Sequence, residues 1–472
     1  MIYITLRTVI YSFLLLNIMK SQEFQLGSFS HLQKKIRDNT YNVNNSISIF
    51  GPNRFNEKYS QSTDSLNNFI YLEYENILSK NINIQKGISF GSYLYLNRHI
   101  FLFLNARIVS DHSLFPRFTG LPREISRFGF NSGETDLAGI GFQNKMHTLQ
   151  FGRGRQSWGA GNDIKLIISE SSSPYEYFMY ELKQKYLRAR YFHGFLERID
   201  GFNRYINGKG VEYYLSKKSS ISLSEIVIYS GLNRSVDFAY FNPVSSHLEI
   251  ELNDRQNYDG TGSGNAAWQF SIDSFIKPNI RFSFNYVIDE FVIDQSERRS
   301  GKVNLDAYST KLVYSADTKK YDYLNYYLSF IKVGTHTFRH ESISPKPGEE
   351  GIGFNNFSHR NLPLGWDYGS DGYEIKLGIN VCILNTFILK TNYSHVRHGS
   401  NSLFNDPYGP YSNTFKTNFP SGTKKYFQLF SGIIKWKHSK NLYTSLSFNI
   451  TKENKKSHLY LLHLKNTYDF NF

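Results

Sequence analysis

Apolar and polar residues alternate one by one along several stretches of the chain. In residues 280–289 the even positions are aromatic or aliphatic and the odd positions are mostly polar. Residues 373–383 and 442–450 show the same period of two. Because the side chains of a β-strand point alternately to opposite faces, this pattern predicts strands with one apolar and one polar face.

The length and spacing of these strands favour a membrane barrel over a soluble sandwich. About eighteen strands are predicted, many of them about 10–12 residues long, whereas strands of soluble sheets usually have about 5–6 residues. Very short connections, such as NKM, LKQ and SKK, alternate with long ones at 111–135, 152–173, 230–265, 335–371 and 397–424. Short turns on one rim and long loops on the other predict an all-β fold, a transmembrane antiparallel outer-membrane β-barrel. An even number of strands places both chain ends on the periplasmic rim.

The N-terminus has the pattern of an exported protein. Arg7 precedes an apolar run from Thr8 to Met19, and the small residue Ser21 follows. This pattern predicts a signal peptide over residues 1–21, cleaved near Ser21. The alternative is a membrane anchor, but the run is short for a span of about 20 residues.

Two further segments complete the predicted organisation. Residues 22–65 alternate poorly and predict either a short periplasmic segment or a plug of the lumen, and the barrel occupies residues 66–472. Even positions of the last stretch are mostly leucine, tyrosine or phenylalanine, ending at Phe472. Such a closing strand resembles the signal that the outer-membrane insertion machinery recognises, so we expect that machinery as a partner.

Composition and charge restrict the classes of binding partner that we expect. The chain carries 35 tyrosines, 39 phenylalanines and a single cysteine, so neither an intrachain disulfide nor a cysteine-based zinc site can form. The formal charge is +14, and +12 without residues 1–21, since only Arg7 and Lys20 are lost (52 − 40). This balance suits anionic partners such as lipopolysaccharide or an acidic glycan. Export makes nucleic acid the least expected partner, and outer-membrane lipid surrounds the predicted wall.

The stretch FGRGRQSWGAG, residues 151–161, is the most conspicuous candidate for chemistry. A dinucleotide loop of the form GxGxxG needs its third glycine where Ser157 stands, and no Walker sequence follows. We therefore expect no nucleotide and no other cofactor. The alternative is that the glycines let a membrane strand bend or bulge near Gly152 into an outer loop, leaving its arginines free for an anionic sugar.

Metal and catalytic sites are not predicted. His336 and His340 have i, i+4 spacing, but in a loop rich in proline and glycine and without the glutamate of a zinc protease. No G-x-S-x-G elbow appears in the sequence. We predict that the protein is not an enzyme.

Aromatic and basic residues of the loops are the candidate ligand contacts. We expect exposed rings there, because flat rings stack on sugar faces, while an aromatic girdle at the outer lipid interface is the alternative. The candidate polysaccharide-binding residues are Arg153, Arg155, Trp158, Tyr175, Trp366 and Tyr411. By the strand period Arg188, Arg190 and Arg281 point into the lumen, and a basic lumen would favour anionic solutes.

Four blocks of this sequence resemble the outer-membrane capsule-assembly protein Wzi family. They are FGR…RQSWGAG, LIISESSSPY, the strand ending YFHGFLE, and YFNPVSSHLEIE at 240–251. The resemblance implies a largely occluded barrel whose outer loops bind capsular polysaccharide and help attach it at the surface, with no known reaction. The N-terminal segment of this chain is shorter than a three-helix bundle, so a helical plug does not carry over.

Three functions follow as hypotheses. The first is a non-catalytic, lectin-like barrel that binds capsular polysaccharide or exopolysaccharide and serves capsule assembly. The second is a diffusion porin or an anion-preferring channel. The third and weakest is a surface hydrolase. The sequence leaves the glycan and the oligomeric state open.

Overall fold

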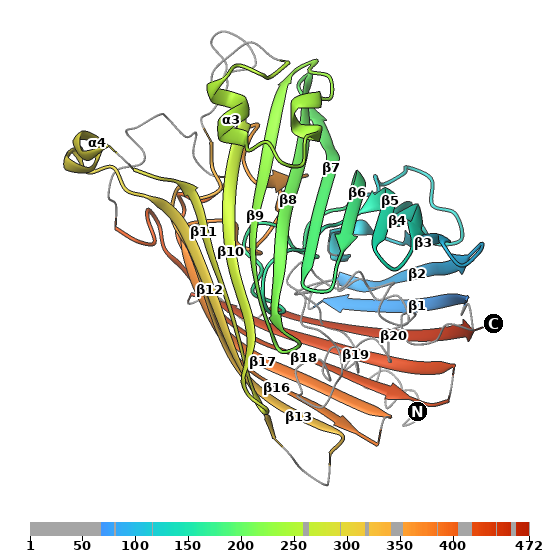
Figure 1. Ribbon diagram of the computed structural model, residues 1–472. Helices are drawn as coiled ribbons and strands as arrows, with labels where there is room; N and C mark the ends of the chain where they lie inside the picture. Colours follow the sequence, from blue (N-terminus) through green and yellow to red (C-terminus); the bar gives the residue numbers. More distant parts are fainter. Residues whose placement is uncertain are drawn as a thin grey trace, which may run out of the picture.

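The computed structural model describes residues 68–79, 82–115, 117–257, 264–292, 294–316, 321–340, 353–384, 386–404, 418–439, 441–454 and 459–471. The predicted signal peptide (1–21) and nearly all of the segment before the first strand lie outside these residues. The described part of the chain is dominated by β-strands (Figure 1).

Eighteen strands form one antiparallel sheet. The first nine are β1 (Phe69–Ser79), β2 (Ile82–Tyr95), β3 (Ile100–Val109), β4 (Ser132–Gln143), β5 (His147–Gly154), β6 (Tyr175–Lys183), β7 (Leu187–Ile199), β8 (Phe202–Ser216) and β9 (Ser219–Leu232). The others are β10 (Gly264–Lys277), β11 (Ile280–Glu290), β12 (Leu305–Ala316), β13 (Tyr323–Val333), β16 (Gly372–Ile383), β17 (Phe387–His398), β18 (Lys425–Lys437), β19 (Leu442–Glu453) and β20 (Leu459–Asn471).

The sheet closes on itself. β1 pairs with β20 in a continuous antiparallel register from Phe69 opposite Asn471 to Ser79 opposite Leu461. Every other strand pairs with its neighbours in chain order, so no edge is left unpaired. The predicted eighteen-stranded antiparallel barrel is confirmed.

The two rims differ in the length of their connections. The rim that carries the C-terminus has only short connections, such as 144–146, 217–218 and 278–279. The long connections lie on the opposite rim, which we call the outer rim. They hold the 3₁₀ helices η1 (His112–Leu114) and η2 (Phe238–Phe241), the helices α3 (His247–Leu252) and α4 (Gln295–Ser300), and the hairpin β14 (Ser358–His359) and β15 (Leu362–Pro363). None of the helices in the described ranges has the length and apolar character needed to cross a membrane.

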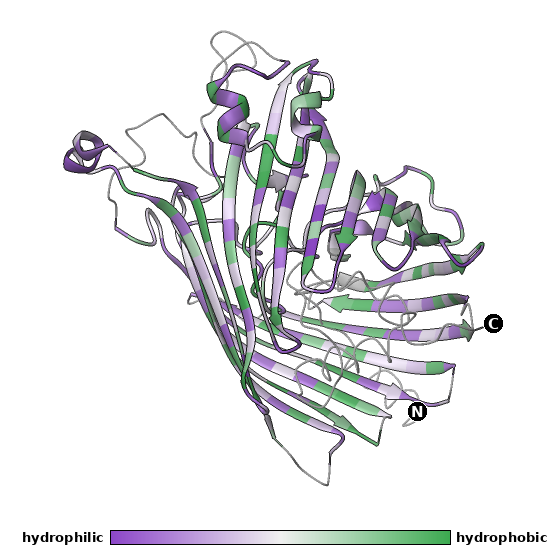
Figure 2. Cartoon of the chain, viewed as in Figure 1, coloured by the Kyte–Doolittle hydropathy of each residue, from purple (hydrophilic) through white to green (hydrophobic). Residues whose placement is uncertain are grey.

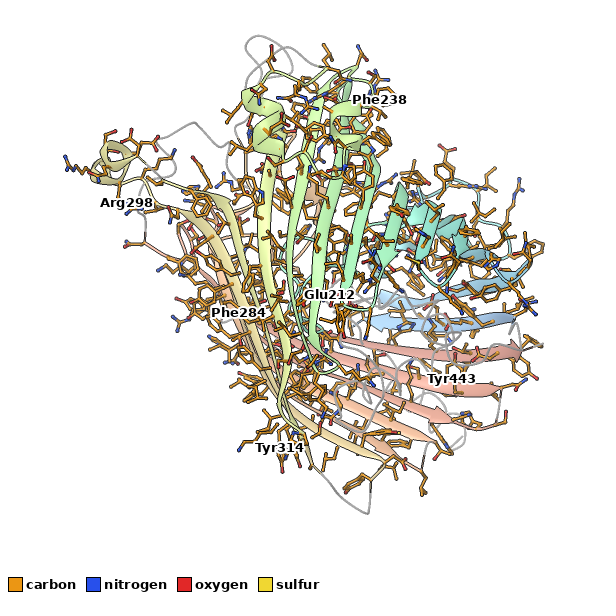
Figure 3. All side chains as sticks on the ribbon, viewed as in Figure 1. Glu212, Phe238, Phe284, Arg298, Tyr314 and Tyr443 are labelled. Carbon is orange, nitrogen blue, oxygen red and sulfur yellow. The ribbon has the colours of Figure 1, made fainter. Side chains whose placement is uncertain are left out.

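Hydrophobic and hydrophilic residues alternate along the strands (Figure 2), and the two faces of the wall have opposite polarity. Exposed apolar side chains cover the outward face, and Figure 3 shows Phe284 and Tyr314 among the residues of this wall. They include Leu72, Ile140, Leu223, Leu312, Leu328, Leu377 and Phe430. Polar residues alternate with them and are buried on the inward face, for example Glu73, Arg188, Asp273, Asn325, Glu374 and Lys435. An apolar outside and a polar inside are the surface of a barrel that spans a membrane.

The largest apolar cluster lies inside the barrel and not between sheet layers. It combines inward-facing residues of β7 to β13, such as Phe192, Ile228 and Ile331, with loop residues such as Ile164 and Leu364. Segments of the outer-rim loops therefore fold into the lumen and bury their apolar side chains there.

Candidate functional site

The connection between β5 and β6 enters the lumen instead of extending outward. We call residues 155–174 the inner loop. Its backbone reaches the strands of the far wall, where the Asn285 amide accepts a hydrogen bond from the backbone N–H of Ala160 at 2.6 Å and donates one to the Ala160 carbonyl at 3.0 Å. On β12, Ser309 donates to the Ile164 carbonyl at 2.7 Å and Lys311 donates to the Asn162 carbonyl at 3.0 Å. The inner loop thus spans the lumen.

The serines of the inner loop satisfy the loop's own polar groups. The Ser172 hydroxyl donates to the Ser169 carbonyl at 3.1 Å, and the Ser169 hydroxyl accepts from the Ser171 N–H at 3.1 Å. Lys165 donates to the Gly159 carbonyl. Small hydroxyl side chains form such local bonds readily, which explains why a serine-rich stretch can be packed in a barrel interior.

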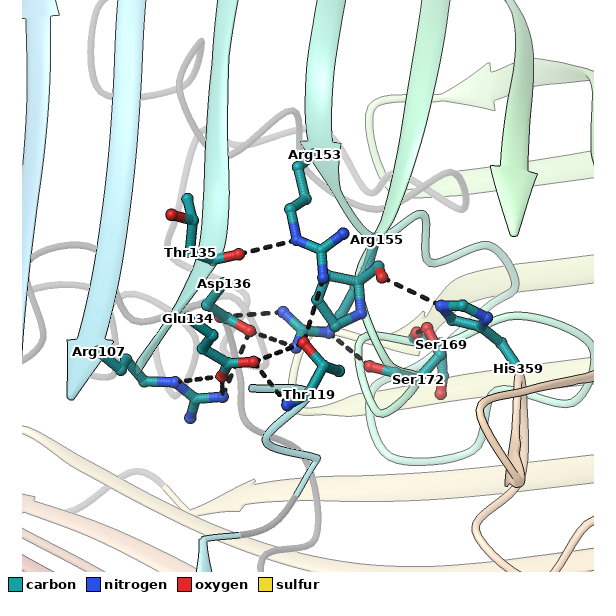
Figure 4. Close-up of polar contacts among 11 residues, drawn as sticks. Arg107, Thr119, Glu134, Thr135, Asp136, Arg153, Arg155, Ser169, Ser172 and His359 are labelled. Carbon is teal, nitrogen blue, oxygen red and sulfur yellow. Dashed lines mark hydrogen bonds and ion pairs between the residues drawn. The ribbon is translucent and has the colours of Figure 1, made fainter. Parts of the chain in front are cut away.

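A second segment crosses from the connection between β13 and β16 and meets the inner loop. We call residues 353–371 the crossing segment. The Ser169 N–H donates to the Leu364 carbonyl at 2.8 Å, and the Trp366 N–H donates to the Leu166 carbonyl at 3.2 Å. The imidazole of His359 lies 3.1 Å from the Pro174 carbonyl (Figure 4). The two segments hold each other in place inside the lumen.

Arg155 anchors the start of the inner loop (Figure 4). Its guanidinium donates to both carboxylate oxygens of Asp136 on β4, at 3.1 Å and 2.5 Å, and to the carbonyl of Ser172 at the end of the loop. Arg107 on β3 lies 3.5 Å from Asp136 and also pairs with Glu134. Their side chains are buried, so each charge depends on its partners for solvation.

Arg153 lies on the other side of the wall. β5 continues without a shift of register through Gly152 to Gly154, and Arg153 stands opposite Glu176 of β6. It donates to the Thr135 carbonyl at 2.8 Å and to Glu176 at 3.0 Å. The predicted glycine bulge and the outward loop after it are therefore wrong: the strand stays regular, and the glycines precede an inward turn, where Gly159 and Gly161 have positive φ of 122° and 67°.

The expectation of exposed aromatic rings is wrong for three residues. Trp158 and Tyr175 are 1% exposed and Trp366 is 4% exposed. Trp158 packs edge-on against Phe192, with ring centroids 5.1 Å apart. The rings are buried because the loops that carry them fold into the lumen. Tyr411 lies outside the described residues.

The three arginines expected to face the lumen lie on the inward face, each beside a carboxylate. Arg188 and Arg190 of β7 both contact Glu181 of β6. Arg281 lies 2.7 Å from Asp273 of the neighbouring strand. Glu212 lies 3.6 Å from Arg188 as a second carboxylate, so each of the three arginines has an acidic partner and they do not present an unpaired basic surface to the lumen.

A small polar cavity lies where the inner loop meets the crossing segment. Its volume is about 40 Å³, enough for a few water molecules but not for a sugar ring. Its lining includes Asp163, Glu170, Trp366, Asp367 and Lys376. Among the described residues no group of three or more potential metal ligands of the His, Cys, Asp and Glu types gathers.

The basic groups at the outer end of this assembly come from three separate segments. We call Arg117, Arg153 and Arg360 the rim cluster. Arg153 donates to the Thr119 hydroxyl at 3.2 Å and Arg360 donates to the Thr119 carbonyl at 3.2 Å. Arg117 pairs with Asp367 at 2.7 Å, and burial lowers the pKa of its guanidinium. Sequence reasoning missed Arg117 and Arg360, because nothing in either sequence neighbourhood signals that Arg360 meets Thr119, 241 positions away, or that Arg117 meets Asp367, 250 positions away.

Comparison with solved structures places this fold among bacterial outer-membrane barrels. The chain is similar to Wzi of Escherichia coli, described as an outer-membrane protein involved in group 1 capsule assembly and a carbohydrate-binding β-barrel. The two share 12% identity with a TM-score of 0.58, over 85% of this chain and 84% of that one. OprD of Pseudomonas aeruginosa shares 9% identity with a TM-score of 0.46, over 86% and 95%. OccAB4 of Acinetobacter baumannii shares 10% with a TM-score of 0.45, over 86% and 99%.

At these identities the likeness concerns the fold alone. No protein-family model matches the chain, and no curated protein matches its sequence.

Proposed function

We propose that this protein is an occluded barrel of the bacterial outer membrane that binds a surface polysaccharide at its outer rim and catalyses no reaction. The observation that carries the proposal is the inner loop, which is hydrogen-bonded to Asn285, Ser309 and Lys311 on the far wall. A loop fixed at both sides of the lumen leaves binding at the outer face as the function that the geometry supports best.

The charge arrangement argues against the anion channel. Anion-selective pores present unpaired basic side chains to the permeating solute. Here Arg188 and Arg190 share Glu181, and Arg281 is paired with Asp273. A permeating anion would have to replace carboxylates that are already in contact with these guanidinium groups.

The rim cluster is the proposed contact for the polysaccharide. Arg153 is partly exposed and Arg360 is exposed, and the two meet at one loop residue. Arg153 is also paired with Glu176, but this carboxylate is exposed, so a ligand anion can replace it far more readily than the buried Glu181 or Asp273 of the lumen. Guanidinium groups bind carboxylates and sulfate-like groups through paired hydrogen bonds. The preferred ligand is therefore an acidic polysaccharide, of capsular or exopolysaccharide type. The buried rings of Trp158, Tyr175 and Trp366 support the loops and do not contact the glycan in this conformation.

Two lines of support are independent of the loops. The apolar outward face fits the outer membrane, in agreement with the predicted signal peptide. The fold is shared with Wzi, which is described as carbohydrate-binding. A role in capsule assembly or attachment, as in the Wzi family, is part of the proposal.

Two measurements on the full-length protein test it. In planar bilayers the protein should be electrically silent, while a variant lacking residues 157–171 should conduct steadily. Immobilised protein should retain acidic polysaccharide extracted from cells that express it, but not neutral dextran. A large steady conductance of the unmodified protein would favour the porin, and failure to retain any of the extracted polysaccharide would refute the binding function.

A further inference from the structure

The connection between β9 and β10 folds onto the outside of the barrel. We call its described residues, 233–257, the outer lobe; it contains η2 and α3. Figure 1 shows α3 beside the outer ends of β8 to β10, and Figure 3 places Phe238 at the same end of the molecule. The structure assigns this lobe a function of its own, as a contact with the membrane surface.

The lobe covers a polar interruption in the lipid-facing band. On β8 the outward positions Tyr213 and Val211 are exposed and apolar in character, but the next one is Lys209. Opposite it on β9 stands Glu225, which follows the exposed Leu223 on the same face. By contrast, the outward positions of β16 remain apolar along the whole strand, from Tyr373 to Ile383.

The lobe forms specific contacts with both charged side chains of this interruption. Lys209 and Glu225 form an ion pair at 2.9 Å, and the lobe adds a bond to each of them. Lys209 donates to the Ser245 carbonyl, and Glu225 accepts from the His247 N–H at 3.0 Å. A charged pair facing lipid would be costly, so the cover is required where the strands are near the bilayer.

Packing under the lobe confirms that it lies on the outward face. Tyr240 stacks on the outward-facing Tyr229 with ring centroids 4.4 Å apart, and its carbonyl accepts from Asn207 at 3.0 Å. Tyr205, Val227 and Ile250 belong to the same buried cluster. This cluster is separate from the one inside the lumen, so β9 is covered on both faces.

The free face of the lobe is apolar. Val244 is 88% exposed, Phe238 83% and Leu252 75%, and Leu248, one helical turn before Leu252, is 51% exposed. Val244, Leu248 and Leu252 are aliphatic and do not stack on sugar rings as aromatic side chains do, and Phe238 is the one ring among these four residues, so this composition suits lipid better than a glycan. On α3, His247 and Ile250 pack against the barrel while Leu248 and Leu252 share the exposed side. An exposed pair of leucines that faces away from the wall is a feature of segments that lie in the membrane interface.

We therefore propose that the outer lobe rests in the outer leaflet, at the boundary between head groups and acyl chains. The occupant of its free face is lipid, because this face continues the lipid-facing wall of Val211 and Leu223 directly below it. The inference depends on the barrel spanning the membrane and not on polysaccharide binding.

A single-cysteine series tests the placement. Cys382 is the only cysteine of the chain and is buried, so Cys382→Ala provides the background. Val244→Cys and Leu248→Cys, labelled with a fluorophore, would be reconstituted in phosphatidylcholine vesicles with brominated acyl chains. Leu223→Cys on the wall is the lipid-facing control, and Ser300→Cys on the polar helix α4 is the water-facing control.

We expect quenching at positions 244 and 248 within about twofold of that at position 223, and almost none at position 300. Quenching at the two lobe positions no greater than at position 300 overturns the inference. If, in addition, the lobe probes respond to added polysaccharide, the face is a glycan site instead. No polysaccharide is present in the first measurement, so its result is independent of the proposed function.

Discussion

Arg153 and Arg155 stand two residues apart in the sequence and lie on opposite sides of the barrel wall. Arg153 is bonded to Glu176 on the outward side at 3.0 Å, and Arg155 is bonded to Asp136 on the inward side at 2.5 Å. Two arginines of one glycine-rich motif therefore have different structural roles. Arg153 belongs to the rim cluster, whereas Arg155 fixes the inner loop.

The first prediction separates these two roles. Arg155→Ala leaves Asp136 with Arg107 alone and frees the loop at the Ser172 carbonyl, so the lumen should open and single-channel conductance should appear. Breaking a buried ion pair typically costs about 3–5 kcal/mol. Arg153→Ala, the matched control, should remain electrically silent. Silence of both variants would show that Arg155 does not hold the loop.

Gly365 allows the second prediction. A Cβ at this position would lie 1.7 Å from the Leu166 carbonyl oxygen, which is backbone and cannot move aside alone. Gly365→Ala should force the crossing segment and the inner loop apart, at a cost of about 1–3 kcal/mol or more. We expect faster proteolysis within residues 155–174 and a lower midpoint of thermal unfolding.

Gly133→Ala is the control for Gly365→Ala. The nearest atom to its Cβ would be a methyl group of Ile108 at 3.3 Å, which can adjust. Its proteolysis and thermal midpoint should be close to those of the unmodified protein. Equal behaviour of the two glycine variants would contradict the close contact between the segments.

The rim cluster gives the third prediction. The double variant Arg153→Ala, Arg360→Ala removes two partly solvated cations, each worth about 0.2–1 kcal/mol. The affinity for acidic polysaccharide should fall by a factor of about 2–30 and lose part of its dependence on salt. The measurement is a binding titration at two ionic strengths. Arg299→Ala, on exposed α4, is the control and should bind like the unmodified protein.

The period of two residues was sufficient to predict the wall. It located all eighteen strands, because in a barrel the outward positions face lipid and the inward positions face polar groups along most of each strand. For the eighth strand the pattern predicts residues 209–215, whereas β8 begins at Phe202. The tight turn at Asp200–Gly201, with φ of 47° and 87°, is a hairpin signal that extends the strand on the outer rim.

The loops could not be predicted in the same way. Whether the inner loop turns into the lumen depends on amide and hydroxyl groups of Asn285 and Ser309, more than 100 positions away in the sequence. Local pattern carries no information about such contacts. The local pattern therefore predicts exposed aromatic rings at loop positions, whereas Trp158 and Trp366 are buried.

The last prediction concerns the response of the outer lobe to acid. Burial lowers the pKa of His247 to about 4, and the positive charges of His340, Lys209 and Arg234 add to this effect. The imidazole also contacts the Tyr240 hydroxyl at 2.9 Å and lies 3.4 Å from Glu251, while its backbone N–H is bonded to Glu225. The folded lobe therefore holds a neutral histidine.

The direction of the pH effect on the stability of the lobe follows from the linkage between protonation and folding. When the lobe opens, His247 regains an ordinary pKa near 6.5 and takes up a proton more readily than in the closed lobe. Its stabilising contribution is fully present above about pH 6.5, falls as the pH drops towards about 4, and is at most about 3 kcal/mol. Burial raises the pKa of Glu251, which acts in the opposite direction.

Hydrogen exchange of residues 238–252, corrected for the intrinsic rate at each pH, measures the opening of the lobe. Protection should decrease between pH 6.5 and 4.5 in the unmodified protein, and His247→Gln should remove most of this dependence. Glu251→Gln should retain it and make it steeper, because the opposing carboxyl group is gone. A pH dependence that is the same with glutamine at position 247 would assign the response to another group. An unchanged protection across this range would mean that His247 is not buried as a neutral group, and that the lobe does not close over Lys209 and Glu225.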